Sequence, residues 1–195
     1  MPDTSPTTYA ELHADAVATL SRWTATGPAA AGNRDRTLSL LAAGPVAMSR
    51  AHRPGHVTAS ALVLDPDGGR VLLCLHRKIG RWMQLGGHCE PGDRSLAAAA
   101  LREATEESGI AGLTLDPTPI DVDIHEVACQ GGSRHYDVRY AAFAPAGAIE
   151  QVSDESEALG WFPPDRLPEP LAHATAQLVA PALARLRPAP PRHAP

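Results

Sequence analysis

Three glutamates near the middle of the chain have the spacing of a metal-binding cluster. Glu103, Glu106 and Glu107 stand three and four residues apart, so on a helix they share one face. Like charges at this spacing destabilise a helix, and acidic side chains in its last turn oppose the helix dipole. A hard divalent cation reverses both penalties, because Mg²⁺ and Mn²⁺ prefer carboxylate oxygens as ligands. The pattern predicts a Mg²⁺ or Mn²⁺ site, and a solvated acidic helix face is the alternative.

The segment that carries these glutamates resembles the box motif of the Nudix family. The family pattern is G-x5-E-x7-R-E-U-x-E-E-x-G-U, in which U is an aliphatic residue. In this chain Gly87 is followed after five residues by Asp93, and after eight more by Arg102-Glu103-Ala104-Thr105-Glu106-Glu107-Ser108-Gly109-Ile110. The resemblance implies a metal-dependent enzyme that cleaves the diphosphate bond of a nucleoside diphosphate linked to another group X.

Two departures from the pattern fall at the start of the predicted helix. Asp93 stands where the family has glutamate, and one extra residue separates it from Arg102. We expect the loop 92–95 to absorb the insertion, with Asp93 or Ser95 as the N-cap of the helix. Gly109 is expected to end the helix in the left-handed conformation. Arg102 is expected to pair with a box carboxylate rather than with substrate.

The resemblance also implies roles for individual acidic residues. Glu103, Glu106 and Glu107 are expected to bind Mg²⁺ or Mn²⁺, by their match to the family positions. A general base would be Glu106, Glu107 or a loop acid such as Glu155. Family members differ on this point, so the base stays open among these three catalytic candidates.

Substrate recognition is expected from basic and polar residues outside the helix. The candidates are Arg77, Arg81, His88 and Arg139. Arginine suits a terminal phosphate because its planar fork matches phosphate oxygens. The alternative to substrate binding is that these residues are simply exposed to solvent, in a loop or on a strand. The group X stays open among nucleoside triphosphates, nucleotide sugars, dinucleoside polyphosphates and nicotinamide dinucleotides.

Two other functions compete with hydrolysis. Type I isopentenyl-diphosphate isomerase has a similar fold and uses histidines near the positions of His56 and His88, together with a reactive cysteine. Here Cys89 follows His88, whereas that enzyme places its cysteine before the histidine. The other alternative is a non-catalytic, nucleotide-sensing module. The retained glutamates favour hydrolysis over both, and a structural role for the two histidines is favoured over metal binding.

Composition limits the partners and the compartment. The formal net charge is −5, and no basic run suggests a nucleic acid polymer as partner. Three cysteines at no metal-ligand spacing indicate a reduced, cytoplasmic protein. No transmembrane run or signal peptide is recognisable, so no membrane partner is expected. The expected partner is a small-molecule diphosphate, and a homodimer stays open.

The expected fold is the α/β Nudix fold, a mixed β-sheet in an α/β/α sandwich with an N-terminal helical extension. The expected divisions are a disordered tail, the helical extension, the Nudix domain and a disordered proline-rich tail, at 1–8, 9–50, 51–187 and 188–195. An apolar stripe from Tyr9 to Trp23 predicts the first helix of the extension. The extension is expected to pack on the domain, and a partner-binding arm is the alternative.

Hydrophobic periodicity and turn residues predict the remaining elements. A second helix is expected at 35–43, and a final amphipathic helix at 169–186 with an interruption at Pro181. Strands are expected at 56–65, 70–77, 120–129 and 134–144, the first two joined by the turn 66–69.

Overall fold

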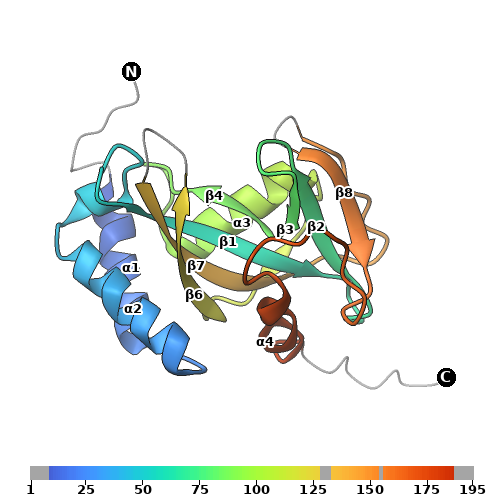
Figure 1. Cartoon of the computed structure of the whole chain (residues 1–195), viewed down its shortest axis with the longest axis horizontal. Coiled ribbons are helices and arrows are strands. Elements are labelled where there is room, and N and C mark those ends of the chain that lie inside the picture. Colours follow the sequence, from blue (N-terminus) through green and yellow to red (C-terminus); the bar gives the residue numbers. More distant parts are fainter. Residues whose placement is uncertain (1–8, 128–132, 154–155, 187–195) are drawn as a thin grey trace.

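The computed structural model describes residues 9–127, 133–153 and 156–186. Within them eight strands form one mixed sheet (Figure 1). The strands are β1 His56–Leu64, β2 Val71–His76, β3 Arg81–Met83, β4 Leu85–His88, β5 Thr114–Leu115, β6 Asp121–Val127, β7 Ser133–Phe143 and β8 Ser156–Phe162. The predicted tails at 1–8 and 188–195 lie outside the described residues, as do Cys129 and Glu155.

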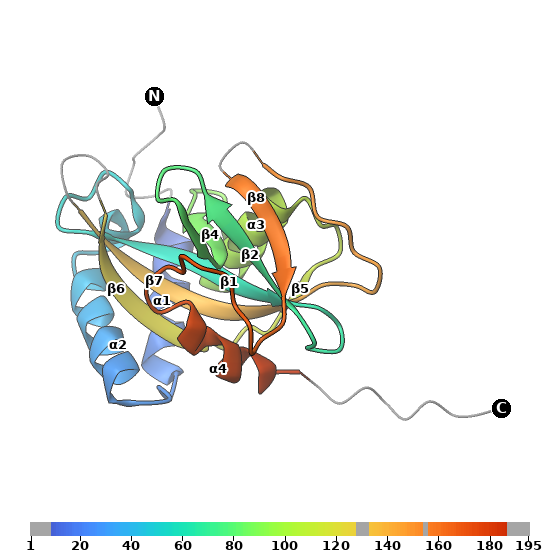
Figure 2. The same cartoon turned by 45° about the vertical axis from the view of Figure 1, so that its right-hand side comes forward.

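Strand β1 lies at the centre of the sheet. It pairs in parallel with β7 and antiparallel with β2 and β4, while β8 lies beside β2 (Figure 2). The β1–β7 register places His56 opposite His135, and the β1–β4 register places Thr58 opposite His88. Successive side chains of a strand point to opposite faces, so this register decides which polar residues meet.

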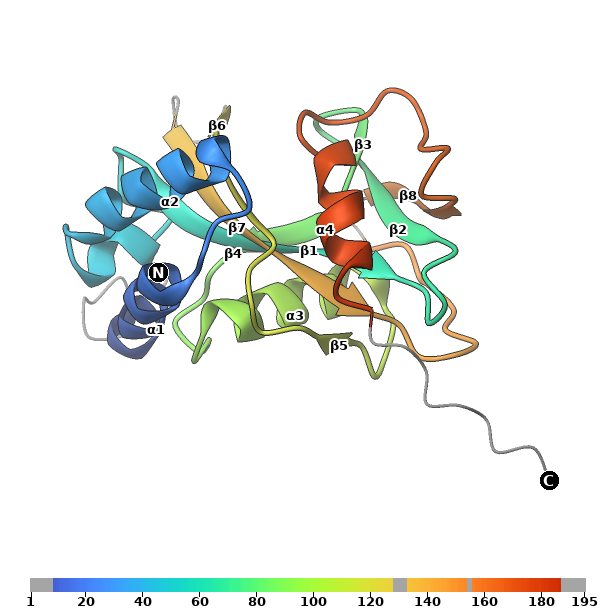
Figure 3. The ribbon, with the colours of Figure 1, turned by 90° about the horizontal axis from the view of Figure 1, so that it is seen from below.

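Helices cover both faces of the sheet. The helices are α1 Ala10–Arg22, α2 Pro28–Leu41, η2 Pro45–Met48, α3 Leu96–Ser108, η4 Ala176–Leu178 and α4 Val179–Leu183. Helix α3 packs with Val57, Ala59 and Ala61 of β1, whereas α4 packs with Leu62 and Leu64. The two helices therefore lie on opposite sides of the sheet, as Figure 3 shows.

The N-terminal helices are attached to the sheet and to α3. The apolar stripe predicted for the first helix is buried, with Leu12, Ala16 and Leu20 at its centre. Asp15 of α1 accepts a hydrogen bond of 2.9 Å from the backbone N–H of Leu96, the first residue of α3. Asn33 of α2 donates one of 2.7 Å to the carbonyl of Val122. The extension packs on the domain in the way that its apolar stripe indicates.

Two helix predictions require correction. The second helix begins at Pro28 rather than Asp35, because proline is well suited to the first helical position. The predicted helix at 169–186 is wrong over its first half, and the helical part is confined to 176–183. Pro170 and Ala172 instead make backbone hydrogen bonds with Trp82 of β3, at 2.9 and 2.8 Å. This pairing to the sheet overrides the helical periodicity. No helix in the described part of the chain is both long and apolar enough to span a membrane.

Candidate active site

The ends of α3 follow local rules of helix capping. The hydroxyl of Ser95 accepts a 3.0 Å hydrogen bond from the N–H of Ala98, so Ser95 is the N-cap. Gly109 ends the helix in the left-handed conformation, at φ 65°. Both predictions are confirmed. The contiguous helix between these caps places Glu103, Glu106 and Glu107 within its last two turns.

Arg102 connects the box carboxylates to the loop that precedes the helix. It donates hydrogen bonds to both carboxylate oxygens of Asp93, each 3.0 Å long, and to the carbonyl of His88 at 2.9 Å. It also contacts Glu103 at 3.1 Å and Glu106 at 3.0 Å. Burial alone would lower the pKa of Arg102, but Asp93 and Glu103 raise it, so the guanidinium stays charged. The predicted partnership of Arg102 with box carboxylates is present.

Two box glutamates reach the backbone of β4. Glu107 is buried, 6 % exposed, and accepts a 2.8 Å hydrogen bond from the N–H of Gly86. The carboxylate of Glu103 lies so close to Gly87 that a Cβ there would stand 2.8 Å from its Oε2. The side chain of Glu106 is 60 % exposed. The glycine pair thus lets the carboxylates of α3 lie against the strand.

The donor set of the box suits a hard divalent cation. Glu103, Glu106 and Glu107 offer carboxylate oxygens, which Mg²⁺ and Mn²⁺ prefer. Because Gly87 has no Cβ, the carboxylate of Glu103 can occupy the space against β4 that a side chain would otherwise fill. Each carboxylate is turned toward a hydrogen-bond donor, Gly86 for Glu107 and Arg102 for the other two. The residues therefore fit the ion by the chemistry of their side chains, and their spacing on α3 puts them on one face of the helix.

A second cluster lies on the opposite face of the sheet from α3. His56, His88 and His135 place one ring nitrogen each so that all three lie within 4.8 Å of one another. Burial and the neighbouring His88 lower the pKa of His56 to about 4. Burial and the neighbouring His56 lower the pKa of His135 to about 3. Sequence reasoning noted His56 and His88 but not that His135 joins them.

Arg139 lies at the centre of a buried network. It is 2 % exposed and contacts Asp137 at 2.9 Å, Asp123 at 3.0 Å and Asp121 at 3.3 Å. Burial alone would lower the pKa of this guanidinium, but Asp137 and Asp123 raise it. The predicted phosphate contact of Arg139 remains a prediction, and the structure gives its guanidinium three carboxylate partners.

The other predicted substrate residues lie in two different places. Arg77 follows β2 and Arg81 begins β3. Both are exposed, and they donate hydrogen bonds to the carbonyls of Ser156 and Leu171, at 3.0 and 3.2 Å. The ring of His88 belongs to the histidine cluster, and its carbonyl accepts from Arg102. Glu155 lies outside the described residues.

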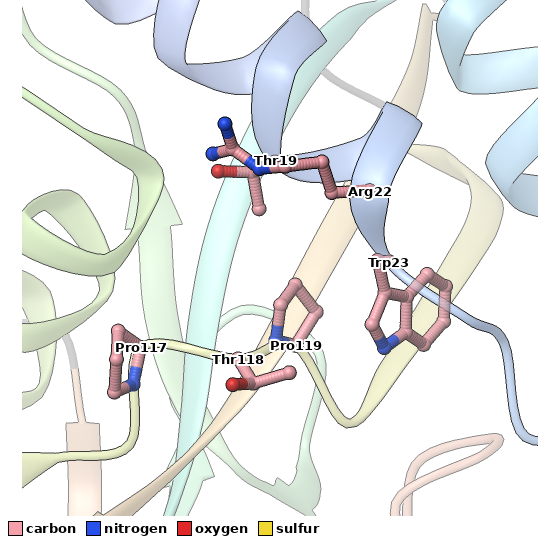
Figure 4. A pocket seen from close by; sticks show the side chains of 6 residues that line it. All are labelled: Thr19, Arg22, Trp23, Pro117, Thr118 and Pro119. Carbon is pink, nitrogen blue, oxygen red and sulfur yellow. The ribbon is translucent and has the colours of Figure 1, made fainter.

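A pocket of about 230 Å³ lies between the end of α1 and the loop 117–119 (Figure 4). Its walls include Thr19, Arg22 and Trp23 from the helix side, and Pro117, Thr118 and Pro119 from the loop. None of the box or histidine-cluster residues lines it. This pocket is separate from both clusters.

Comparisons with known proteins agree with the geometry. A family model described as the NUDIX domain matches residues 54–183. A MutT-like protein of Streptomyces ambofaciens is 28 % identical over 123 residues, which cover 63 % of this chain and 74 % of that protein. The structure of a NUDIX-family hydrolase from Clostridium perfringens is 25 % identical, with a TM-score of 0.55, over 68 % of this chain and 98 % of that one. The NUDIX domain of Shewanella oneidensis NrtR, solved with ADP-ribose, shares the fold at 23 % identity and a TM-score of 0.52, over 71 % of this chain and 92 % of that one.

Proposed function

The chain belongs to the Nudix family, and from this premise we propose that it is a Mg²⁺-dependent enzyme that hydrolyses a nucleoside diphosphate linked to a group X. The observation that carries the proposal is the contact between α3 and β4. Glu107 accepts a hydrogen bond from Gly86, and Glu103 lies against Gly87, so two of the three carboxylates lie against the same strand. Mn²⁺ has the same ligand preference and is the expected substitute.

The box glutamates have two parts in the proposed reaction, cation binding and proton transfer. Glu103, Glu106 and Glu107 would hold the cation, and a bound cation would neutralise phosphate charge and lower the pKa of water. Glu106, the exposed carboxylate, is the best placed of the three to accept a proton from water. The water oxygen then bonds to phosphorus while the bond to the bridging oxygen breaks. Glu107 and Glu155 remain the other candidates for the base.

The remaining parts of the chain support this chemistry in the proposal. Residues 51–187 form the catalytic domain, and 9–50 form an extension that supports the start of α3 through Asp15. Arg77 and Arg81 supply positive charge to phosphates as they approach. The proposed partner is a small-molecule diphosphate.

The surroundings of Cys89 argue against the isomerase alternative. That enzyme needs a reactive cysteine, and the nucleophilic form of a cysteine is the thiolate. Cys89 is 3 % exposed and packs in the core with α3. Burial raises the pKa of its thiol, so the thiolate is disfavoured. The order of Cys89 and His88 in the chain points the same way.

One assay distinguishes the three functions. The full-length protein is incubated with Mg²⁺ and a nucleoside triphosphate, a nucleotide sugar, a dinucleoside polyphosphate, a nicotinamide dinucleotide and isopentenyl diphosphate. We expect phosphorus NMR to show a nucleoside monophosphate from at least one of the nucleotides, with the signal lost in EDTA and restored by Mg²⁺. Formation of dimethylallyl diphosphate alone would establish the isomerase. Saturable binding without any product would establish the sensor.

A further inference from the structure

Three histidines from three different strands meet on one face of the sheet. His56 begins β1, His88 ends β4 and His135 lies near the start of β7. His56 and His135 are direct cross-strand partners, while His88 is the partner of Thr58, two residues further along β1. The ring centroids are 4.8 to 5.1 Å apart. Strand pairing therefore brings the rings together before any ligand is present.

His56, the buried member of the cluster, has two ring nitrogens without a hydrogen-bond partner in the described structure. The residue is 2 % exposed. An unsatisfied buried polar group costs about 1–3 kcal/mol. Apolar residues of similar size would avoid this cost, so packing alone does not explain a histidine here. A ligand that accepts a nitrogen lone pair does explain it.

We propose that His56, His88 and His135 form a second metal site that takes a first-row transition ion of intermediate softness, with Zn²⁺ as its best probe. Imidazole nitrogen suits Zn²⁺, whereas Mg²⁺ prefers oxygen ligands. Ligand atoms that all lie within 4.8 Å of one another can surround a single ion with small side-chain movements. Neutral imidazole is the form that binds metal, and the buried position of His56 disfavours the charged form.

The site has an open side and a supported side. His88 and His135 are half-buried, so solvent or a substrate group can reach the ion. Three protein ligands leave the fourth tetrahedral position of Zn²⁺ for such a group. Behind the cluster, Asp137 accepts hydrogen bonds from Thr58 and Ser60, at 3.1 and 2.8 Å. These bonds tie β1 to β7 directly beside the histidines.

The proposed site is distinct from the box carboxylates but shares one strand with them. Gly87 faces α3, because a Cβ there would meet Glu103, whereas the ring of His88 is on the opposite face. The carbonyl of His88 accepts from Arg102, and Gly86 donates to Glu107. An ion bound to His88 would therefore fix the strand against which the box carboxylates lie.

Zinc binding to the full-length protein tests the proposal. The protein is stripped with EDTA, dialysed, and titrated with Zn²⁺ by calorimetry in excess Mg²⁺, so that the carboxylates are already occupied. We expect one Zn²⁺ per chain in the wild type, with affinity reduced by about 100-fold or more in His135→Ala and His88→Ala, since even outer partners of a metal matter about 10–100-fold. Bound Co²⁺ should give the visible spectrum of nitrogen ligation.

Matched controls separate this site from surface histidines and from the box. The chain has nine histidines, and His76→Ala on β2 removes one outside the cluster. His76→Ala and Glu106→Gln should both retain the Zn²⁺ of the wild type. Circular dichroism verifies the fold of each variant, and a Zn²⁺-dependent rise in Tm in the wild type provides a second readout. Absence of Zn²⁺ uptake by the wild type, or uptake unchanged in both His88→Ala and His135→Ala, overturns the proposal, whatever the outcome of the hydrolysis assay.

Discussion

Asp93 and Arg102 are joined by two hydrogen bonds, each 3.0 Å long. The shorter acid and the extra residue between the two positions therefore do not separate them. The carboxylate of Asp93 also accepts a 2.7 Å hydrogen bond from the N–H of Glu90, and this bond closes the turn 90–93. Asp93 thus has a structural use that keeps Arg102 beside the box glutamates.

Removal of the Asp93 charge should destabilise the protein. The side chains of Asp93 and Arg102 are 6 % and 22 % exposed, so water screens the pair only partly. We expect Asp93→Asn to lower the free energy of unfolding by about 2 kcal/mol, measured in urea. Asp35→Asn, which breaks a pair whose acid is 65 % exposed, should cost below about 1 kcal/mol. Equal losses of unfolding free energy in the two variants would show that Asp93 does not stabilise the protein more than an exposed ion pair does.

Loss of charge at the box should stop turnover without unfolding the protein. We expect Glu106→Gln and Glu107→Gln each to lower kcat by about 100-fold or more, because each removes a cation ligand or a base. Steady-state kinetics on whichever substrate the nucleotide panel identifies gives the values. Glu126→Gln, at an exposed position on β6, is the matched control and should retain full activity. Wild-type turnover in both box variants would place the cation elsewhere.

Gly87 should be required for activity more than for stability. Its φ is not in the left-handed region, so alanine fits the backbone, but the new Cβ would press on the carboxylate of Glu103. We expect Gly87→Ala to lower turnover by about 100-fold, because small misplacements of reacting groups have effects of that size. A Mg²⁺ titration of activity shows the effect. Gly92→Ala, where nothing lies within 4 Å, should behave as the wild type.

Arg139 should be required for folding. Its removal leaves Asp121, Asp123 and Asp137 together without their cation. We expect Arg139→Met to lower the free energy of unfolding by about 3–5 kcal/mol, measured by denaturant titration. Arg134→Met removes an exposed arginine from the same strand and should change stability little. A raised KM with unchanged stability would instead identify Arg139 as a substrate residue.

Cys89 should be dispensable for catalysis. Its thiol is buried among apolar residues, and burial raises its pKa, so it serves packing. We expect Cys89→Ala to retain nucleotide hydrolysis within about twofold, with a stability loss of about 1 kcal/mol from the small cavity. Loss of nucleotide hydrolysis in a folded Cys89→Ala protein would contradict a packing role and give the thiol a part in the reaction.

Local sequence predicted the box helix well because its signals are local. Ser95 and Gly109 cap it, and the spacing of its glutamates decides which face they share. The helix expected from residue 169 is wrong because Pro170 and Ala172 pair with Trp82, a contact that periodicity does not reveal. The strands expected at 56–65, 70–77, 120–129 and 134–144 correspond to β1, β2, β6 and β7, because apolar runs and turn residues are also local signals. Contacts between segments far apart in the sequence are what could not be predicted.

The same distinction holds for the polar face of the sheet. Successive side chains of a strand point to opposite faces, so the sequence at 134–144 is enough to put His135, Asp137 and Arg139 on one face. It did not indicate that β6 would place Asp121 and Asp123 opposite them, which buries Arg139. Nor could it show that the parallel pairing of β1 and β7 would bring His135 to His56. Contacts between residues of different strands depend on the strand register, which is a property of the whole fold.

The hydrogen bond from Leu96 to Asp15 has a practical consequence for the boundaries of the protein. The recognisable family segment starts at residue 54, yet the first turn of its key helix relies on an acceptor far upstream. A fragment that begins at residue 54 would also expose the apolar surface that Leu12, Ala16 and Leu20 cover. The smallest stably folded fragment of this protein is therefore expected to begin well before residue 54.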